Sequence, residues 1–170
     1  SELIASLEGN PDYTVTRGLT TGEFTLGINN AREYLSDLKV REAIRAAIDH
    51  EAIIELISGD GLIQTGPVPP SDPWFVEHPG IPFDPDHARD LLAEAGVPAD
   101  YPLAFRFPNH YNEDIAQFVV GSLNDVGFDV SLEMVDFNGV WLPEVYGDRN
   151  YDLTAVLHIE PRDIGNYGKD

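Results

Sequence analysis

The chain has 170 residues, enough for one domain with a buried core, and 42 % of them are hydrophobic, as in ordinary globular proteins. It holds 30 acidic residues against 10 basic ones, and a formal net charge of -20 repels phosphate backbones and anionic membranes, so we expect no nucleic-acid partner. The absence of cysteine excludes disulfides and thiolate metal sites, and no apolar run approaches the roughly 20 residues of a membrane span.

The first part of the chain predicts one strand and two helices. Residues 23–28 alternate polar and apolar side chains, as a half-buried strand does. Asp37 is placed to cap a helix with one apolar face, formed by Val40, Ala43, Ile44, Ala47 and Ile48. Asp49 is placed to cap a second helix that ends at Gly59 and turns three isoleucines inward, Ile53, Ile54 and Ile57.

Residues 61–85 are rich in proline and glycine and predict a long loop, which carries Trp74. Long loops without regular structure in compact domains are usually functional or mobile. After this loop, strand and helix patterns alternate. They predict a helix from Pro85 to Gly96, strands at 103–107, 128–135 and 151–157, a helix over 115–123 and a short one over 140–146. Such alternation is typical of a parallel α/β sheet with right-handed crossovers.

An open parallel sheet places its ligand beyond the carboxyl ends of its strands. This rule selects three loops, at 108–112, 136–139 and 158–163. They contain hydrogen-bonding and aromatic side chains but no nucleophile–base pair, so they suit binding better than covalent chemistry. The sequence has no glycine-rich phosphate loop, and its five histidines never recur at helical spacing, so we expect neither a cofactor nor a metal.

Several segments in a fixed order resemble one protein family. The segment Asp37–His50, with the sequence DLKVREAIRAAIDH, is similar to a helix of the family-5 solute-binding proteins, the dipeptide, oligopeptide and nickel receptors of ABC importers. The similarity continues in order through 66–70, 83–96, 124–130 and 150–153. Together these segments cover most of the chain from Phe24 to Leu157.

The resemblance implies a fold and a division of the chain. The fold is a mostly parallel, twisted α/β sheet flanked by helices, one lobe of a two-lobed periplasmic-binding-protein-like (type II) fold. We expect residues 1–30 to be a linker and crossing strand from a first lobe, 31–157 to be the second lobe, and 158–170 to return toward the first. The chain is then an excised lobe, without the first lobe and the lipoprotein signal of the family.

The implied function is capture of a peptide or similar small solute outside the membrane and its delivery to ABC permease subunits. The protein would be lipid-anchored on the outer face of the membrane or periplasmic, and it would not be an enzyme. Alternatives within the family are receptors for nickel chelates, haem, sugars or opines. Outside it, the alternatives are a doubly wound enzyme, for which no cofactor loop or nucleophile is visible, and a sensory or adhesion module.

The resemblance also implies ligand contacts. Asp163 lies where peptide-binding members place an aspartate that pairs with the α-amino group of the ligand, and Glu160 is a competing candidate. A carboxylate facing an ammonium group in a closed, dry cleft is stabilised by charge-assisted hydrogen bonds.

Other residues are candidates for the remainder of the ligand. His110, next to Asn109, occupies the loop where dipeptide-binding members place a basic residue near the ligand carboxylate, and Arg162 is the alternative. Trp74 is a candidate for the cleft wall, whereas Trp141, beside Val140 and Leu142, is expected in the core.

Overall fold

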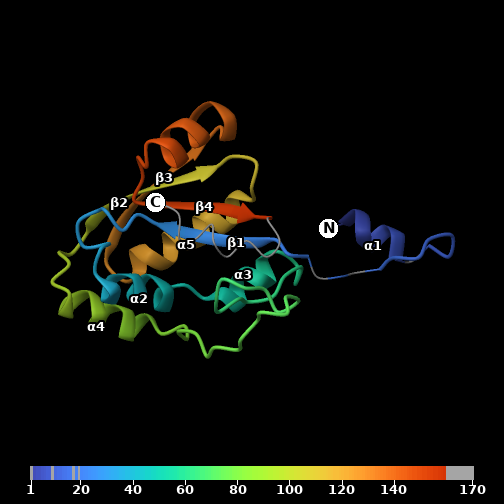
Figure 1. Ribbon diagram of the computed structural model, residues 1–170, viewed down its shortest axis with the longest axis horizontal. Helices are drawn as coiled ribbons and strands as arrows, with labels where there is room; N and C mark the ends of the chain where they lie inside the picture. The colour runs from blue at the N-terminus through green and yellow to red at the C-terminus, as the bar shows by residue number, and fades with distance from the viewer. Residues whose placement is uncertain (1, 9, 17, 19, 160–170) are drawn as a thin grey trace.

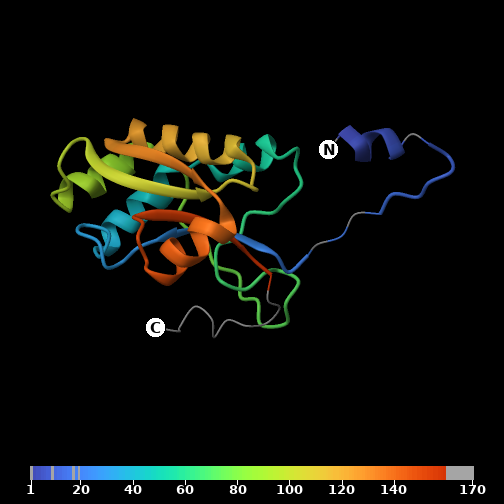
Figure 2. The same ribbon diagram turned by 90° about the horizontal axis from the view of Figure 1, so that it is seen from above.

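The computed structural model describes residues 2–8, 10–16, 18 and 20–159 (Figure 1). In chain order the elements are α1 (Glu2–Glu8), β1 (Glu23–Ile28), α2 (Leu38–Ala47), α3 (His50–Leu56), α4 (Pro85–Glu94), β2 (Tyr101–Pro108), α5 (Glu113–Asp125), β3 (Phe128–Val135), the π-helix η1 (Phe137–Gly147) and β4 (Leu153–His158). Helix α1 lies apart from the other elements, at the end of an extended arm (Figures 1 and 2). Across the described residues, no helix combines the length and apolar character needed to cross a membrane.

The strands form one sheet in the order β1-β4-β2-β3. Strand β2 is parallel to both β3 and β4, which confirms the predicted, mostly parallel sheet. Strands β2 and β3 run in matched register, with Tyr101 opposite Phe128 and Pro108 opposite Val135. The edge strand β1 is antiparallel to β4, which the strand pattern alone did not specify.

The two faces of the sheet are covered differently. Helices α2, α4 and α5 cover one face, and η1 lies on the other (Figure 2). The larger core lies under the helices and contains the apolar faces predicted from the sequence, including Val40, Ile44, Leu92, Phe105 and Leu123. A smaller core lies under η1 and is formed by Val135, Trp141 and Val145, which confirms Trp141 as a core residue.

The predicted helix caps are present. The carboxylates of Asp37, Asp49 and Asp84 accept hydrogen bonds from the first-turn amides of α2, α3 and α4. Gly59 and Gly96 follow α3 and α4 with φ values of +74° and +69°, a left-handed conformation that costs glycine little.

The isoleucines predicted to turn inward at α3 do so only in part. Ile53 packs against the larger core, whereas Ile54 and the C-cap residue Ile57 lie beside Gly61 at the start of the following loop. No residue of α3 is fully buried, and Ile53, Ile54 and Ile57 are only partly buried. A Cβ atom on Gly61 would lie 3.0 Å from Ile54 Cδ1 and 3.3 Å from Ile57 Cδ1, so these two side chains pack under the start of the loop.

The second half of the chain shows two further differences. The short helix expected over 140–146 is the longer π-helix η1. Strand β4 begins at Leu153, because the Asp152 carboxylate accepts a 2.8 Å hydrogen bond from the Ala104 amide at this point. Between α3 and α4 the chain has no helix or strand, as the proline-rich composition predicts.

Candidate functional site

The carboxyl ends of the parallel strands meet at one edge of the sheet. The Asn109 amide donates a 2.9 Å hydrogen bond to the Val135 carbonyl at the end of β3. The Leu157 amide near the end of β4 donates to the Tyr111 hydroxyl, at 3.1 Å. The loop after β2 therefore contacts the ends of both neighbouring strands, so the described residues of the three loops selected by the strand-end rule begin at one edge of the sheet.

His110 is an exposed polar side chain at this edge. Its ring centroid lies 4.0 Å from that of Tyr111 and 5.0 Å from that of Phe137, the first residue of η1. Asn109 is exposed beside it. Asn112, two residues further on, is used locally, because its side chain accepts a hydrogen bond from the Asp114 amide and caps α5. The structure thus brings His110, Asn109 and Phe137 together.

Aromatic rings extend from this edge along η1. Phe137 stacks on Trp141 with ring centroids 5.0 Å apart and an angle of 13° between the ring planes. Trp141 in turn lies 6.1 Å from Tyr146. We call the series His110, Phe137, Trp141 and Tyr146 the aromatic row. The sequence did not indicate the whole row. Phe137 and Trp141 have the i, i+4 spacing of an ordinary helix, but Tyr146 follows Trp141 by five positions, as neighbours in a π-helix do, and His110 comes from a separate loop.

The other candidates from the sequence are not part of this group. Trp74 is 78 % exposed in the proline-rich loop, where its amide bonds to the Asp72 carboxylate. That loop and the end of β4 lie on the same side of the molecule in both views (Figures 1 and 2). Glu160, Arg162 and Asp163 lie outside the described residues, directly after the described end of the chain at Ile159.

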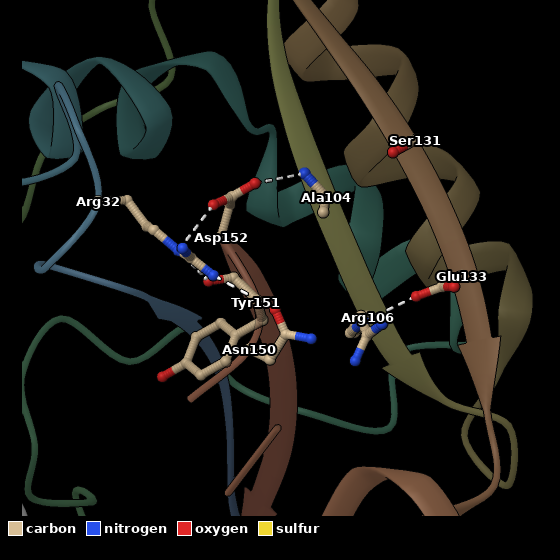
Figure 3. Close-up of a pocket in the computed structure, with 8 residues that line it drawn as sticks. All are labelled: Arg32, Ala104, Arg106, Ser131, Glu133, Asn150, Tyr151 and Asp152. Atoms are coloured by element: carbon tan, nitrogen blue, oxygen red, sulfur yellow. Dashed lines mark hydrogen bonds and ion pairs between the residues drawn. The ribbon is translucent and has the colours of Figure 1, made fainter. Parts of the chain in front are cut away.

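A pocket of about 410 Å³ lies elsewhere, on the face of the sheet that carries η1. Its floor is Ala104 and Arg106 of β2 with Ser131 and Glu133 of β3, and its other wall comes from Arg32 and residues 150–152 (Figure 3). These groups lie at the middle of β2 and β3 and before the start of β4, away from the carboxyl edge.

The charges in this pocket are already paired. Arg106 Nε lies 2.7 Å from the Glu133 carboxylate, and its Nη1 lies 2.8 Å from Glu144. The hydrogen bond with Glu144 is the main reason that the pKa of the Arg106 guanidinium is raised. Arg32 Nε lies 3.2 Å from Asp152, as the dashed lines in Figure 3 show. The charged side chains around the pocket therefore form ion pairs with one another. These pairs join η1, the sheet and the loop after β1.

The strand-end edge has the chemistry of a binding surface. It presents an exposed imidazole, an amide side chain and aromatic rings on the sheet, and the described part of the edge contains no pair of a nucleophile and a base. Among the described residues, no group of three or more histidine, aspartate or glutamate side chains is arranged to hold a metal ion.

Known proteins are similar to this chain in sequence and in fold. A profile of bacterial extracellular solute-binding proteins, family 5, middle region, matches residues 1–158. The chain is 27 % identical over 150 residues to the oligopeptide-binding protein AppA of Bacillus subtilis, and 28 % identical over 138 residues to the glutathione-binding protein GsiB of Escherichia coli. These alignments cover 78 % and 79 % of this chain, which spans only 27 % of the length of each relative.

The fold also matches a solved structure. The periplasmic binding protein DppA of Helicobacter pylori, determined in complex with the peptide STSA, superposes with a TM-score of 0.83 at 22 % identity. The match covers 98 % of this chain and 33 % of DppA, and it shows a common fold.

Proposed function

Because this chain belongs to the bacterial extracellular solute-binding proteins of family 5, we propose that it is the ligand-binding second lobe of a receptor that captures a peptide and delivers it to an ABC permease. Members of the family are extracellular or periplasmic solute-binding proteins and not enzymes. We also propose that the full-length protein is held on the outer face of the membrane by a lipid anchor, and that it does not hydrolyse peptides.

The observation that supports this function most strongly is the edge where the carboxyl ends of β2, β3 and β4 meet. His110 is exposed there and contacts Phe137 from the next strand end. A rigid sheet edge with convergent polar groups and aromatic rings favours binding of a small ligand. The relatives AppA and GsiB, named for binding oligopeptides and glutathione, favour a peptide over the other solutes of the family.

The proposed division of the chain is supported by the pairing of β1 with β4. Glu23 lies opposite His158, so the chain enters β1 and leaves β4 at the same edge of the molecule. Two strands that cross between lobes would lie side by side in this way. We propose that residues 1–30 come from the first lobe, that 31–157 form the second, and that 158–170 return to the first.

We propose one group of residues for each end of the bound peptide. Asp163 pairs with the α-amino group, with Glu160 as the competing acid. His110 and Asn109 meet the α-carboxylate, with Arg162 as the alternative cation. Trp74 lines the cleft from the proline-rich loop.

Calorimetry on the full-length protein tests the proposal with one tripeptide in three forms: free, N-acetylated and C-terminally amidated. Removing one partner of a desolvated, hydrogen-bonded charge pair typically costs about 2–5 kcal/mol. We therefore expect each blocked form to bind at least about tenfold more weakly than the free peptide. Absence of binding across a varied peptide library, with tight binding of a non-peptide solute, would replace the peptide with another ligand of the family.

A further inference from the structure

The imidazole of His110 is held on two sides although it is exposed. The Tyr111 ring lies against it at an angle of 47°, and Phe137 meets it almost perpendicularly, at 84°. No hydrogen bond joins its ring nitrogens to any part of the chain that the structure describes. The ring is thus restrained by aromatic contacts, while its nitrogens are available to a ligand.

Phe137 is held in turn by the buried Trp141. The two rings stack nearly parallel, and Trp141 is only 5 % exposed. Its Nε1 donates a 2.8 Å hydrogen bond to the Thr154 hydroxyl, which donates to the Arg106 carbonyl at 2.7 Å. Turning the indole away would leave a buried N–H group without a partner, so this bond fixes the plane on which Phe137 stacks.

The elements that carry these rings are also joined. Arg106 of β2 pairs with Glu144 of η1, which holds the π-helix against the sheet. The Tyr111 hydroxyl accepts a hydrogen bond from the Leu157 amide. This bond joins the Tyr111 ring, on the other side of His110, to β4. Both rings that touch His110 are therefore anchored to strands of the sheet.

We propose that Thr154, Trp141 and Phe137 are positioning residues, which orient the His110 imidazole toward the carboxylate of a bound peptide. The inference rests on the proposed function, because it assumes that His110 meets this carboxylate. A side chain that is restrained before binding loses less conformational entropy when the ligand arrives, and this strengthens binding. The gain applies only to ligands that use His110.

Two substitutions test the inference in the full-length protein. Phe137→Leu removes the ring and keeps apolar bulk, and Thr154→Val removes the hydroxyl that fixes Trp141. Calorimetry compares a peptide acid with its C-terminal amide. We expect each variant to bind the acid about three- to tenfold more weakly than the wild type does, with little change for the amide. In a His110→Ala background, Phe137→Leu should have no further effect on the acid.

Tyr146→Leu is the matched control. Tyr146 belongs to the same aromatic row and stacks on Trp141, but it is 74 % exposed and lies at the end away from His110. We expect this variant to keep the wild-type preference for the acid. Melting temperatures identify any variant that fails to fold, and the Phe137 substitution does not disturb the Thr154 hydrogen bonds.

The possible failures can be told apart. Equal losses for acid and amide in both variants would show a purely structural role and would overturn the inference alone. A wild-type protein that binds acid and amide equally would also overturn it, because His110 would then not meet the carboxylate. A wild-type protein that binds no peptide would overturn the proposed function and this inference with it.

Discussion

His110 and Asn112 lie two residues apart in the loop after β2 and have different roles. The asparagine caps α5, whereas the histidine is exposed between two aromatic rings. The strand-end rule selected the loop that contains both residues, but a sequence pattern could not separate the cap from the candidate ligand contact. The separation depends on Phe137, which is 27 positions further along the chain and reaches His110 only through the pairing of β2 with β3.

Asp163 gives the prediction that belongs most clearly to a single residue. Asp163→Asn keeps the shape of the side chain and removes its charge. If the ligand is a peptide with a free amino terminus, affinity should fall at least about tenfold in the full-length protein, since a desolvated charge pair loses one partner. Calorimetry with free and N-acetylated peptides measures this, and the two changes together should be less than additive.

Glu160→Gln is the control for the Asp163 prediction. We expect it to leave the affinity near the wild-type value. Loss of binding in Glu160→Gln with none in Asp163→Asn would make Glu160 the amine anchor. Wild-type affinity in both variants, with equal binding of N-acetylated peptides, would show that the amino terminus is not recognised.

At the scale of elements, the sequence predicted helices with capping residues well. Asp37, Asp49 and Asp84 each precede an apolar face and each caps its helix. In place of the π-helix η1 the sequence predicted only a short helix over 140–146, whereas the helix in the structure runs from Phe137 to Gly147, contains Pro143 and buries Trp141 and Val145. Its position depends on tertiary contacts, chiefly those of Trp141 with Thr154 and of Arg106 with Glu144.

The junction between α2 and α3 should make stability depend on pH. His50 Nδ1 lies 2.7 Å from the Ile48 carbonyl oxygen and 2.6 Å from Arg45 Nη1. Burial, and next the charge of Arg45, lower the pKa of His50 below its usual value of 6.5. As pH falls from 6.5 to the lowered pKa, the unfolded chain binds a proton at His50 and the folded chain does not, so the free energy of unfolding decreases.

Urea unfolding across this pH range measures the effect, with His50→Gln as the comparison. The glutamine variant should show a smaller decrease in the free energy of unfolding below pH 6.5 than the wild type. Parallel curves for the two proteins would mean that His50 has the same pKa in the folded and unfolded states.

At the scale of the molecule, the alternation of strands and helices predicted the parallel sheet, but not its edges. The antiparallel pairing of β1 with β4 joins residues more than 120 positions apart, such as Ile28 and Leu153, and local periodicity contains no information about such a pair. The pocket by Arg106 was equally inaccessible to sequence reasoning, since its charged residues come from separate parts of the chain.

The proposed two-lobed arrangement predicts that this lobe alone binds its ligand poorly. Receptors that close two domains around a ligand draw affinity from both of them. A separate lobe would leave the ligand with about half of its contacts, so we expect a much lower affinity than for the full-length protein. Calorimetry with the same peptide on both proteins checks this, and equal affinities would show that the first lobe contributes no contacts.

The location of the ligand on this lobe is the central claim, and hydrogen–deuterium exchange on the full-length protein tests it most directly. Addition of a peptide that binds should slow amide exchange in the strand-end loops, at residues 109–112 and 136–139. The exchange rates of residues 149–152, beside the Arg106 pocket, should stay unchanged. Slower exchange confined to 149–152, with unchanged exchange in both strand-end loops, would place the ligand in the pocket and contradict the account.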